Sequence, residues 1–94
     1  PPELVDFVIT PLGVKSGKVF FHWRLIDHFY IIYRAKGIKN LYIEFKNPLR
    51  GRLVIPLDDQ NAVAIRDYLL QFISEDLERE AEPISEQLRK FLKL

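Results

Sequence analysis

The residues best suited to proton transfer or metal binding lie close together in this 94-residue chain. His22 and His28, its only histidines, stand six positions apart, and Asp27 immediately precedes the second. A metal site needs three or four ligands at close spacing, so two histidines and one carboxylate fall short. We therefore interpret His22 as a half-exposed strand residue, and we predict no metal site and no cofactor.

Nucleophilic catalysis has no better support. The chain's only serines are Ser16, Ser74 and Ser85, and none lies in a Gly-x-Ser-x-Gly turn. The four glycines are scattered, which is not the pattern of a phosphate-binding loop. The pair Asp58-Asp59 is explained as a helix cap. We predict that the protein is not an enzyme and has no small-molecule substrate.

A basic cluster is the sharpest remaining signal. In the stretch "KNPLRGR", Lys46, Arg50 and Arg52 bracket a predicted hairpin turn and could gather three cations at one end of a sheet. Each basic residue near an anionic membrane contributes about 1 kcal/mol, enough for weak membrane-surface contact. Binding of an anionic lipid or phosphoinositide headgroup by these three residues is therefore an alternative function.

Composition limits the class of protein. The chain is 48% hydrophobic and 29% charged, typical of one folded domain, and it has no cysteine for disulfides or thiolate metal sites. The net charge of +1 conceals a basic first part, with nine Lys and Arg against four Asp and Glu in residues 1–57, and an acidic remainder. Tyrosines interleaved with basic residues leave single-stranded nucleic acid as a weaker alternative, because the overall charge is so low.

Period-two alternation of apolar residues predicts strands between about residues 4 and 57. Ser16-Gly17 predicts a tight hairpin, since Gly17 can supply the positive φ of a two-residue turn. Pro56 must lie at a strand end or a sheet edge. The whole pattern predicts an antiparallel meander that curls on itself.

The periodicity then changes to that of helices. Residues 59–74 predict an amphipathic helix capped by Asp58-Asp59, with Val63 and Leu70 on its solvent side. We expect a linker over 75–82 and a second short helix over 83–93, opened by Pro83. That second helix would pack either on the first or on something outside this chain.

The aromatic stretch 18–33 supplies two faces of the predicted sheet. One face should be buried beneath the first helix, and its members are Phe21, Trp23, Phe29, Ile31 and Tyr33. The opposite face should be exposed, and its members are Phe20, Tyr30, Ile32 and Tyr42. Because an exposed apolar patch of this kind marks an interface, we predict that it contacts a protein partner or another copy of the chain.

Residues 5–73 resemble the bacterial PH-like domains of small membrane-anchored proteins of unknown function. The resemblance rests on "VITPLGVKSG", "WRLID", "FYIIYR", "LYIEFK" and "LVIPLDDQNAVAIRDYLLQFI". It implies a single mainly β, α+β domain over 1–94, in which a curled antiparallel sheet or half-barrel of 5–7 strands is closed by a C-terminal helix. The second helix departs from that pattern.

The resemblance also implies a context. Such domains follow transmembrane helices and lie on the cytoplasmic side of the membrane, so an anchor is expected upstream of Pro1, and the isolated domain is expected to be soluble. It implies a scaffold without chemistry of its own, since one fold hosts many functions. Together with the absence of catalytic patterns, it predicts a non-catalytic interaction module that acts through protein-protein contact or self-association.

Overall fold

The structure is a computed structural model that describes residues 6–78. Strands outnumber helices in it, which confirms the prediction of a mainly β, α+β domain. Its elements, in chain order, are β1 (Phe7–Ile9), β2 (Gly13–Ser16), β3 (Val19–His22), the 3-10 helix η1 (Trp23–Leu25), β4 (Ile26–Tyr33), η2 (Ala35–Gly37), β5 (Lys39–Phe45), η3 (Pro48–Arg50), β6 (Arg52–Pro56), α1 (Ala62–Leu69) and β7 (Ser74–Glu75).

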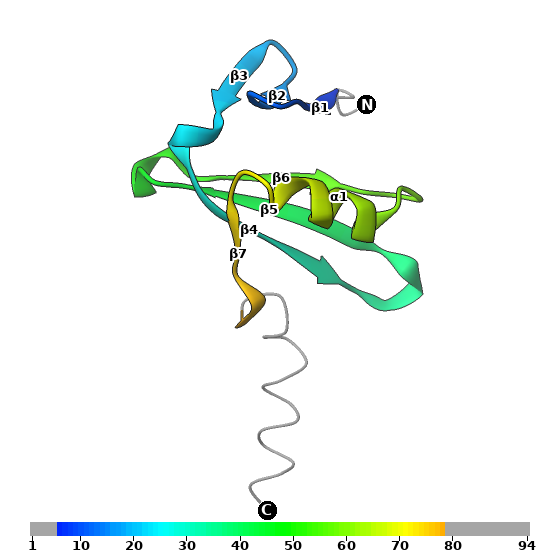
Figure 1. Ribbon diagram of the computed structural model, residues 1–94. Helices are drawn as coiled ribbons and strands as arrows, with labels where there is room; N and C mark the ends of the chain where they lie inside the picture. Colours follow the sequence, from blue (N-terminus) through cyan, green and yellow to red (C-terminus); the bar gives the residue numbers. More distant parts are fainter. Residues whose placement is uncertain (1–5, 79–94) are drawn as a thin grey trace, which may run out of the picture.

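The strands form two sheets that lie one above the other in Figure 1. The smaller is antiparallel in the order β1-β2-β3, and the larger has the order β6-β5-β4-β7. The expectation of purely antiparallel pairing is wrong at one edge, because β7 runs parallel to β4. A parallel partner requires a long connection, and the chain through β5, β6 and α1 provides it. Pro56 ends β6, an edge strand, as predicted.

The core lies between the two sheets and α1. Val14 and Phe21 come from the smaller sheet, while Leu69 comes from α1. The larger sheet contributes its inner face, where four residues are fully buried, namely Phe29, Ile31, Leu41 and Ile43. Burying a large apolar side chain stabilises a fold by about 1.5–3 kcal/mol, so this cluster dominates the stability of so small a domain.

One end of the core is sealed by aromatic stacking. The Trp23 ring stacks on Phe72 at 5.1 Å between centroids, and its indole N–H donates to the Pro11 carbonyl at 3.0 Å. Trp23 was expected in a strand and lies in η1, but it is buried, as are Phe29 and Leu69. The predicted closure beneath the helix is therefore confirmed.

The predicted hairpin at Gly17 is present one residue later than expected. Ser16 pairs with Val19, so Gly17 and Lys18 form the two-residue turn, and Gly17 has the positive φ of 62° that such turns favour. The same hairpin needs Gly13, because a Cβ there would lie 2.1 Å from the Phe21 carbonyl oxygen.

The first helix is shorter than the predicted span of 59–74. It begins at Ala62, where the Asn61 side chain accepts from the Ala64 N–H at 3.1 Å. The expected cap at Asp58-Asp59 is thus wrong, since Asp58 lies in a turn with φ 53°. The solvent side is confirmed: Val63 and Leu70 are exposed.

The segment after the first helix also differs from the prediction. β7 begins inside the predicted helix, at Ser74, and ends in the predicted linker. The predicted helix over 83–93 lies outside the described residues.

Candidate interaction surface

Alternation along β4, β5 and β6 gives the larger sheet an outer face opposite the core. A β-bulge at Asp27 determines which residues of β4 point outward. Ile26 pairs with Phe45 and His28 pairs with Glu44, which leaves Asp27 as the extra residue. The bulge lets both Ile26 and Phe29 point into the core while His28 points outward. The outer face of these three strands consists of His28, Tyr30, Ile32, Asn40, Tyr42, Glu44, Arg52, Val54 and Pro56.

Two tyrosines lie side by side at the centre of this face. Tyr30 and Tyr42 are direct cross-strand partners, and their rings stack with centroids 4.9 Å apart and planes within 6°. Tyr30 is fully buried and Tyr42 nearly so, at 0% and 8% exposure. The expectation that both would be exposed is wrong: the two rings cover each other, and the Tyr30 hydroxyl lies among hydrogen-bonded side chains.

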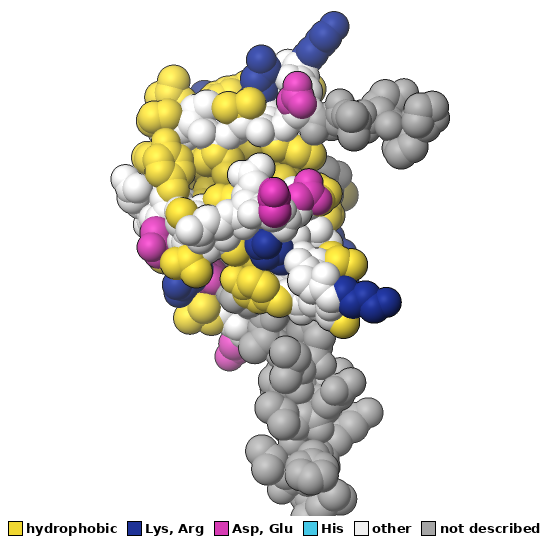
Figure 2. All heavy atoms as spheres, turned by 90° about the vertical axis from the view of Figure 1, so that its right-hand side faces the viewer, with side chains coloured by type: hydrophobic (Ala, Val, Ile, Leu, Met, Phe, Trp, Pro, Cys, Tyr) yellow, Lys and Arg dark blue, Asp and Glu magenta, His cyan; other side chains and the backbone are white. Residues whose placement is uncertain are grey.

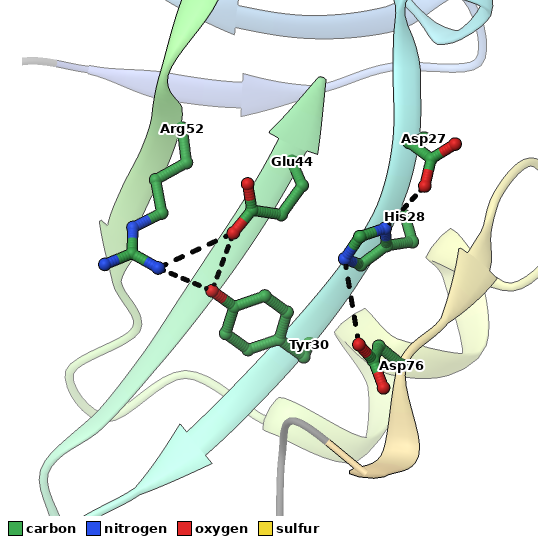
Figure 3. A network of polar contacts seen from close by, with 6 residues as sticks. All are labelled: Asp27, His28, Tyr30, Glu44, Arg52 and Asp76. Atoms are coloured by element: carbon green, nitrogen blue, oxygen red, sulfur yellow. Dashed lines mark hydrogen bonds and ion pairs between the residues drawn. The ribbon is translucent and has the colours of Figure 1, made fainter. Parts of the chain in front are cut away.

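The Tyr30 hydroxyl is held on two sides (Figure 3). It donates to Glu44 Oε2 at 2.9 Å and accepts from Arg52 Nη1 at 2.9 Å, while Arg52 and Glu44 also form an ion pair at 3.5 Å. The Arg52 guanidinium lies 5.4 Å above the Tyr42 ring centroid, in cation–π range. We call Tyr30, Tyr42, Glu44 and Arg52 the outer-face network.

Electrostatics follow from these contacts. Hydrogen bonding to Arg34 lowers the pKa of Tyr42 below its ordinary value of 10.0, against the opposing effect of burial. The pKa of Arg52 is raised, chiefly by Tyr30, so its guanidinium stays charged. Arg52 keeps 46% of its side chain exposed, and Arg34 is exposed as well. Two exposed arginines, Arg34 and Arg52, therefore lie beside the buried tyrosine pair, and Arg52 is partly neutralised by Glu44.

His28 continues this face toward β7. Its Nδ1 lies 2.7 Å from Asp27 Oδ2, and its Nε2 faces Asp76 Oδ2 at 3.9 Å, which is too long for a hydrogen bond (Figure 3). The sequence spacing could not reveal Asp76, which β7 brings to the histidine. Ser74 is the register partner of His28, yet Nε2 is buried and has no hydrogen-bond partner. The arrangement thus activates no serine hydroxyl.

The predicted basic cluster is divided by the sheet. The Arg50 guanidinium lies 5.7 Å from the Phe21 ring centroid and 5.6 Å from that of Phe45, both core residues. Arg52 points to the outer face, and Lys46 is exposed after the end of β5. Arg50 belongs to η3 and lies outside β6, so the rule that strand residues two apart share a face does not apply to Arg50 and Arg52. The Arg50 guanidinium meets the rings of Phe21 and Phe45, whereas that of Arg52 meets Tyr42.

The predicted interface residues are likewise divided between the sheets. Phe20 is exposed, as expected, but it lies on β3 of the smaller sheet beside Lys15. Tyr30 and Tyr42 belong to the outer-face network, and Ile32 is half-buried beside them on β4. Tyr33, predicted in the core, is 48% exposed because β4 continues past the core toward η2.

A further polar contact joins α1 to β7. Arg66 Nε donates to Glu75 Oε1 at 2.6 Å, and the Glu75 side chain is only 3% exposed. The pair holds β7 against the helix that precedes it. Over residues 6–78, no group of three or more His, Cys, Asp and Glu is placed to hold a metal ion.

Comparison of the chain with protein-family models, with curated proteins and with solved structures finds no match. In the described part of the chain, no helix has the length and apolar character needed to cross a bilayer.

Proposed function

We propose that this chain is a non-catalytic interaction module that binds a partner protein through the outer face of the larger sheet. The observation that carries the proposal is the outer-face network, in which a buried pair of stacked tyrosines holds the half-exposed Arg52 in place before any partner arrives. Arginine is enriched at the energetic centres of protein interfaces. Side chains that are already ordered lose little entropy on binding, which favours affinity.

The chemistry of the face suggests the chemistry of the partner. Arg52 is half exposed above the Tyr42 ring, Val54 beside it is 42% exposed, and Arg34 adds a second cation. A partner surface with an acidic side chain opposite the arginines and an apolar side chain against Val54 would complement this face. A second copy of the chain is the simplest competing partner.

We extend the proposal to the scaffold and its location. A PH-like fold would explain two stacked sheets with one helix against the core, although β7, parallel to β4 after the helix, departs from the expected pattern. As the resemblance implies, the module would lie on the cytoplasmic side of a membrane to which an upstream segment anchors it.

Site-specific photo-crosslinking tests the proposed surface. A photoreactive residue replacing Val54 on the outer face is expected to form a crosslinked adduct in cells, whereas one replacing Val63 on the solvent side of α1 is not. Arg52→Gln should abolish the Val54 adduct. Equal adducts from both positions, or adducts that survive Arg52→Gln, would contradict the proposal.

A pair of charge variants separates this function from lipid-headgroup binding. Arg50→Gln and Arg52→Gln remove the same charge from positions two residues apart, but only Arg52 lies on the outer face. If the outer face binds the partner, only Arg52→Gln weakens the adduct. If the basic cluster binds anionic lipid, both variants reduce co-sedimentation with phosphatidylserine vesicles.

A further inference from the structure

The smaller sheet has an open edge at β1. Thr10 and Gly13 exchange both backbone hydrogen bonds, at 2.8 and 3.3 Å, and the Gly17 N–H donates to the Asp6 carbonyl at 2.9 Å. In an antiparallel pair, residues that face the partner alternate with residues that face away. Phe7 and Ile9 therefore direct their N–H and C=O groups away from β2. Within residues 6–78, β1 pairs with β2 alone.

An apolar groove lies beside that edge. It has a volume of about 310 Å³ between β1 and α1, and it is lined by Phe7, Ile9, Gln60, Ala64, Ile65 and Tyr68. Figure 2 looks onto this side of the molecule and shows a band of hydrophobic side chains between the upper layer and the middle of the molecule. The open backbone edge and the apolar groove thus form one continuous surface.

Four exposed aspartates lie close in sequence to the residues that line the groove. Asp6 precedes Phe7 on β1, Asp67 precedes Tyr68 on α1, and Asp58 and Asp59 lie just before the helix; all four are exposed. None of them has an ion-pair partner in the described part of the chain. Arg66, the only basic residue of α1, is engaged by Glu75 on another side of the helix.

We propose that the groove between β1 and α1 binds an extended, positively charged segment of a partner protein by strand addition. The segment pairs with the N–H and C=O groups of Phe7 and Ile9, which supply affinity without regard to sequence. Its alternate apolar side chains enter the groove against Ala64, Ile65 and Tyr68, and its basic side chains approach the aspartates. This surface is separate from the outer-face network and can operate whether or not that network binds a partner.

Titration of the full chain with a synthetic peptide tests the proposal. The probe is an acetylated, amidated heptapeptide of alternating Lys and Val, with the Glu/Val heptapeptide as the charge control. Hydrogen exchange at the Phe7 and Ile9 amides is expected to slow at least tenfold with the Lys/Val peptide and to be unchanged with the Glu/Val peptide. Unchanged exchange with both peptides at millimolar concentration overturns the proposal.

Methylated peptides test the strand geometry. N-methylation of all Val amides and N-methylation of all Lys amides block opposite edges of the peptide strand. One of these peptides should therefore lose binding while the other retains it. Equal binding of both would overturn strand addition.

Matched variants of α1 test the location. Ala64→Lys places a cation in the groove and should weaken binding at least tenfold, whereas Val63→Lys, one residue away and outside the groove lining, should leave it unchanged. Equal weakening of peptide binding by the two variants overturns the assignment to this groove.

Hydrogen exchange without peptide tests for other occupants. If the Phe7 and Ile9 amides are already protected and the protection rises with protein concentration, a second copy of the chain occupies the groove. If the protection does not depend on protein concentration, the chain's own last residues occupy it. Either result overturns the proposal of a separate partner.

Discussion

The two faces of the larger sheet both hold buried side chains, but these are buried by different means. On the inner face, Phe29, Leu41 and Ile43 are covered by α1 and the smaller sheet through apolar packing. On the outer face, Tyr30 is equally buried, and its described contacts are a neighbouring ring and hydrogen-bonded side chains. The inner face therefore contributes most of the folding stability, whereas the outer face holds polar groups in defined positions that a partner can recognise.

The largest effect is expected from the inner face. Phe29→Ala should lower the free energy of unfolding by about 3–5 kcal/mol, because it removes a fully buried ring and leaves a cavity. Urea denaturation of the full chain, followed by tryptophan fluorescence from Trp23, measures the change. A loss below about 1 kcal/mol would mean that the core relaxes around the cavity and that the contrast between the faces is overstated.

An intermediate effect is expected from removing one oxygen atom on the outer face. Tyr30→Phe keeps the stacked ring but deprives Glu44 of a donor and Arg52 of an acceptor, so it should cost about 1–3 kcal/mol. The same denaturation experiment measures it. In a cycle with Glu44→Gln, a coupling energy of at least about 0.5 kcal/mol is expected, because the two groups are in contact. Strict additivity would show that the hydrogen bond contributes nothing to the face.

The smallest effect concerns ionisation. Because hydrogen bonding to Arg34 lowers the pKa of Tyr42, its phenolate should form at lower pH than that of an unperturbed tyrosine. The folded state then gains stability as the pH rises from the lowered pKa toward 10.0, and that gain is lost again as the pH falls through the lowered pKa.

Absorbance at 295 nm measures this ionisation. Tyr42→Phe should remove the earliest step of the titration, and Arg34→Gln should move that step to higher pH. If Arg34→Gln leaves the earliest step where it was, Arg34 does not act on Tyr42, and the positive charge attributed to the outer face would have to come from Arg52 alone.

The sequence predicted local structure well where a local rule determines it. Alternation located the strands, the positive φ of Gly17 marked its hairpin, and the exposed side of α1 was recognised from Val63 and Leu70. The helix boundaries were less accurate, because four acidic or amide residues in a row precede the helix and only Asn61 caps it.

The candidate surface was predicted only in outline. Alternation placed Tyr30 and Tyr42 on the face away from the core, but it could not show that they bury each other, since that depends on cross-strand register. It grouped Arg50 with Arg52 because they are close in sequence, although their guanidinium groups meet different partners. Asp76 was missed entirely, because its approach to His28 requires β7 to return beside β4.

The sequence by itself determined that this chain is mainly β, with an amphipathic helix after the strands and an apolar core, because hydrophobic periodicity reports which side of each element avoids water. Tertiary structure alone decided which polar side chains meet. Hydrogen bonds such as those of Tyr30 act over about 3 Å, and which residues come that close depends on register, on the bulge at Asp27 and on the order of the strands.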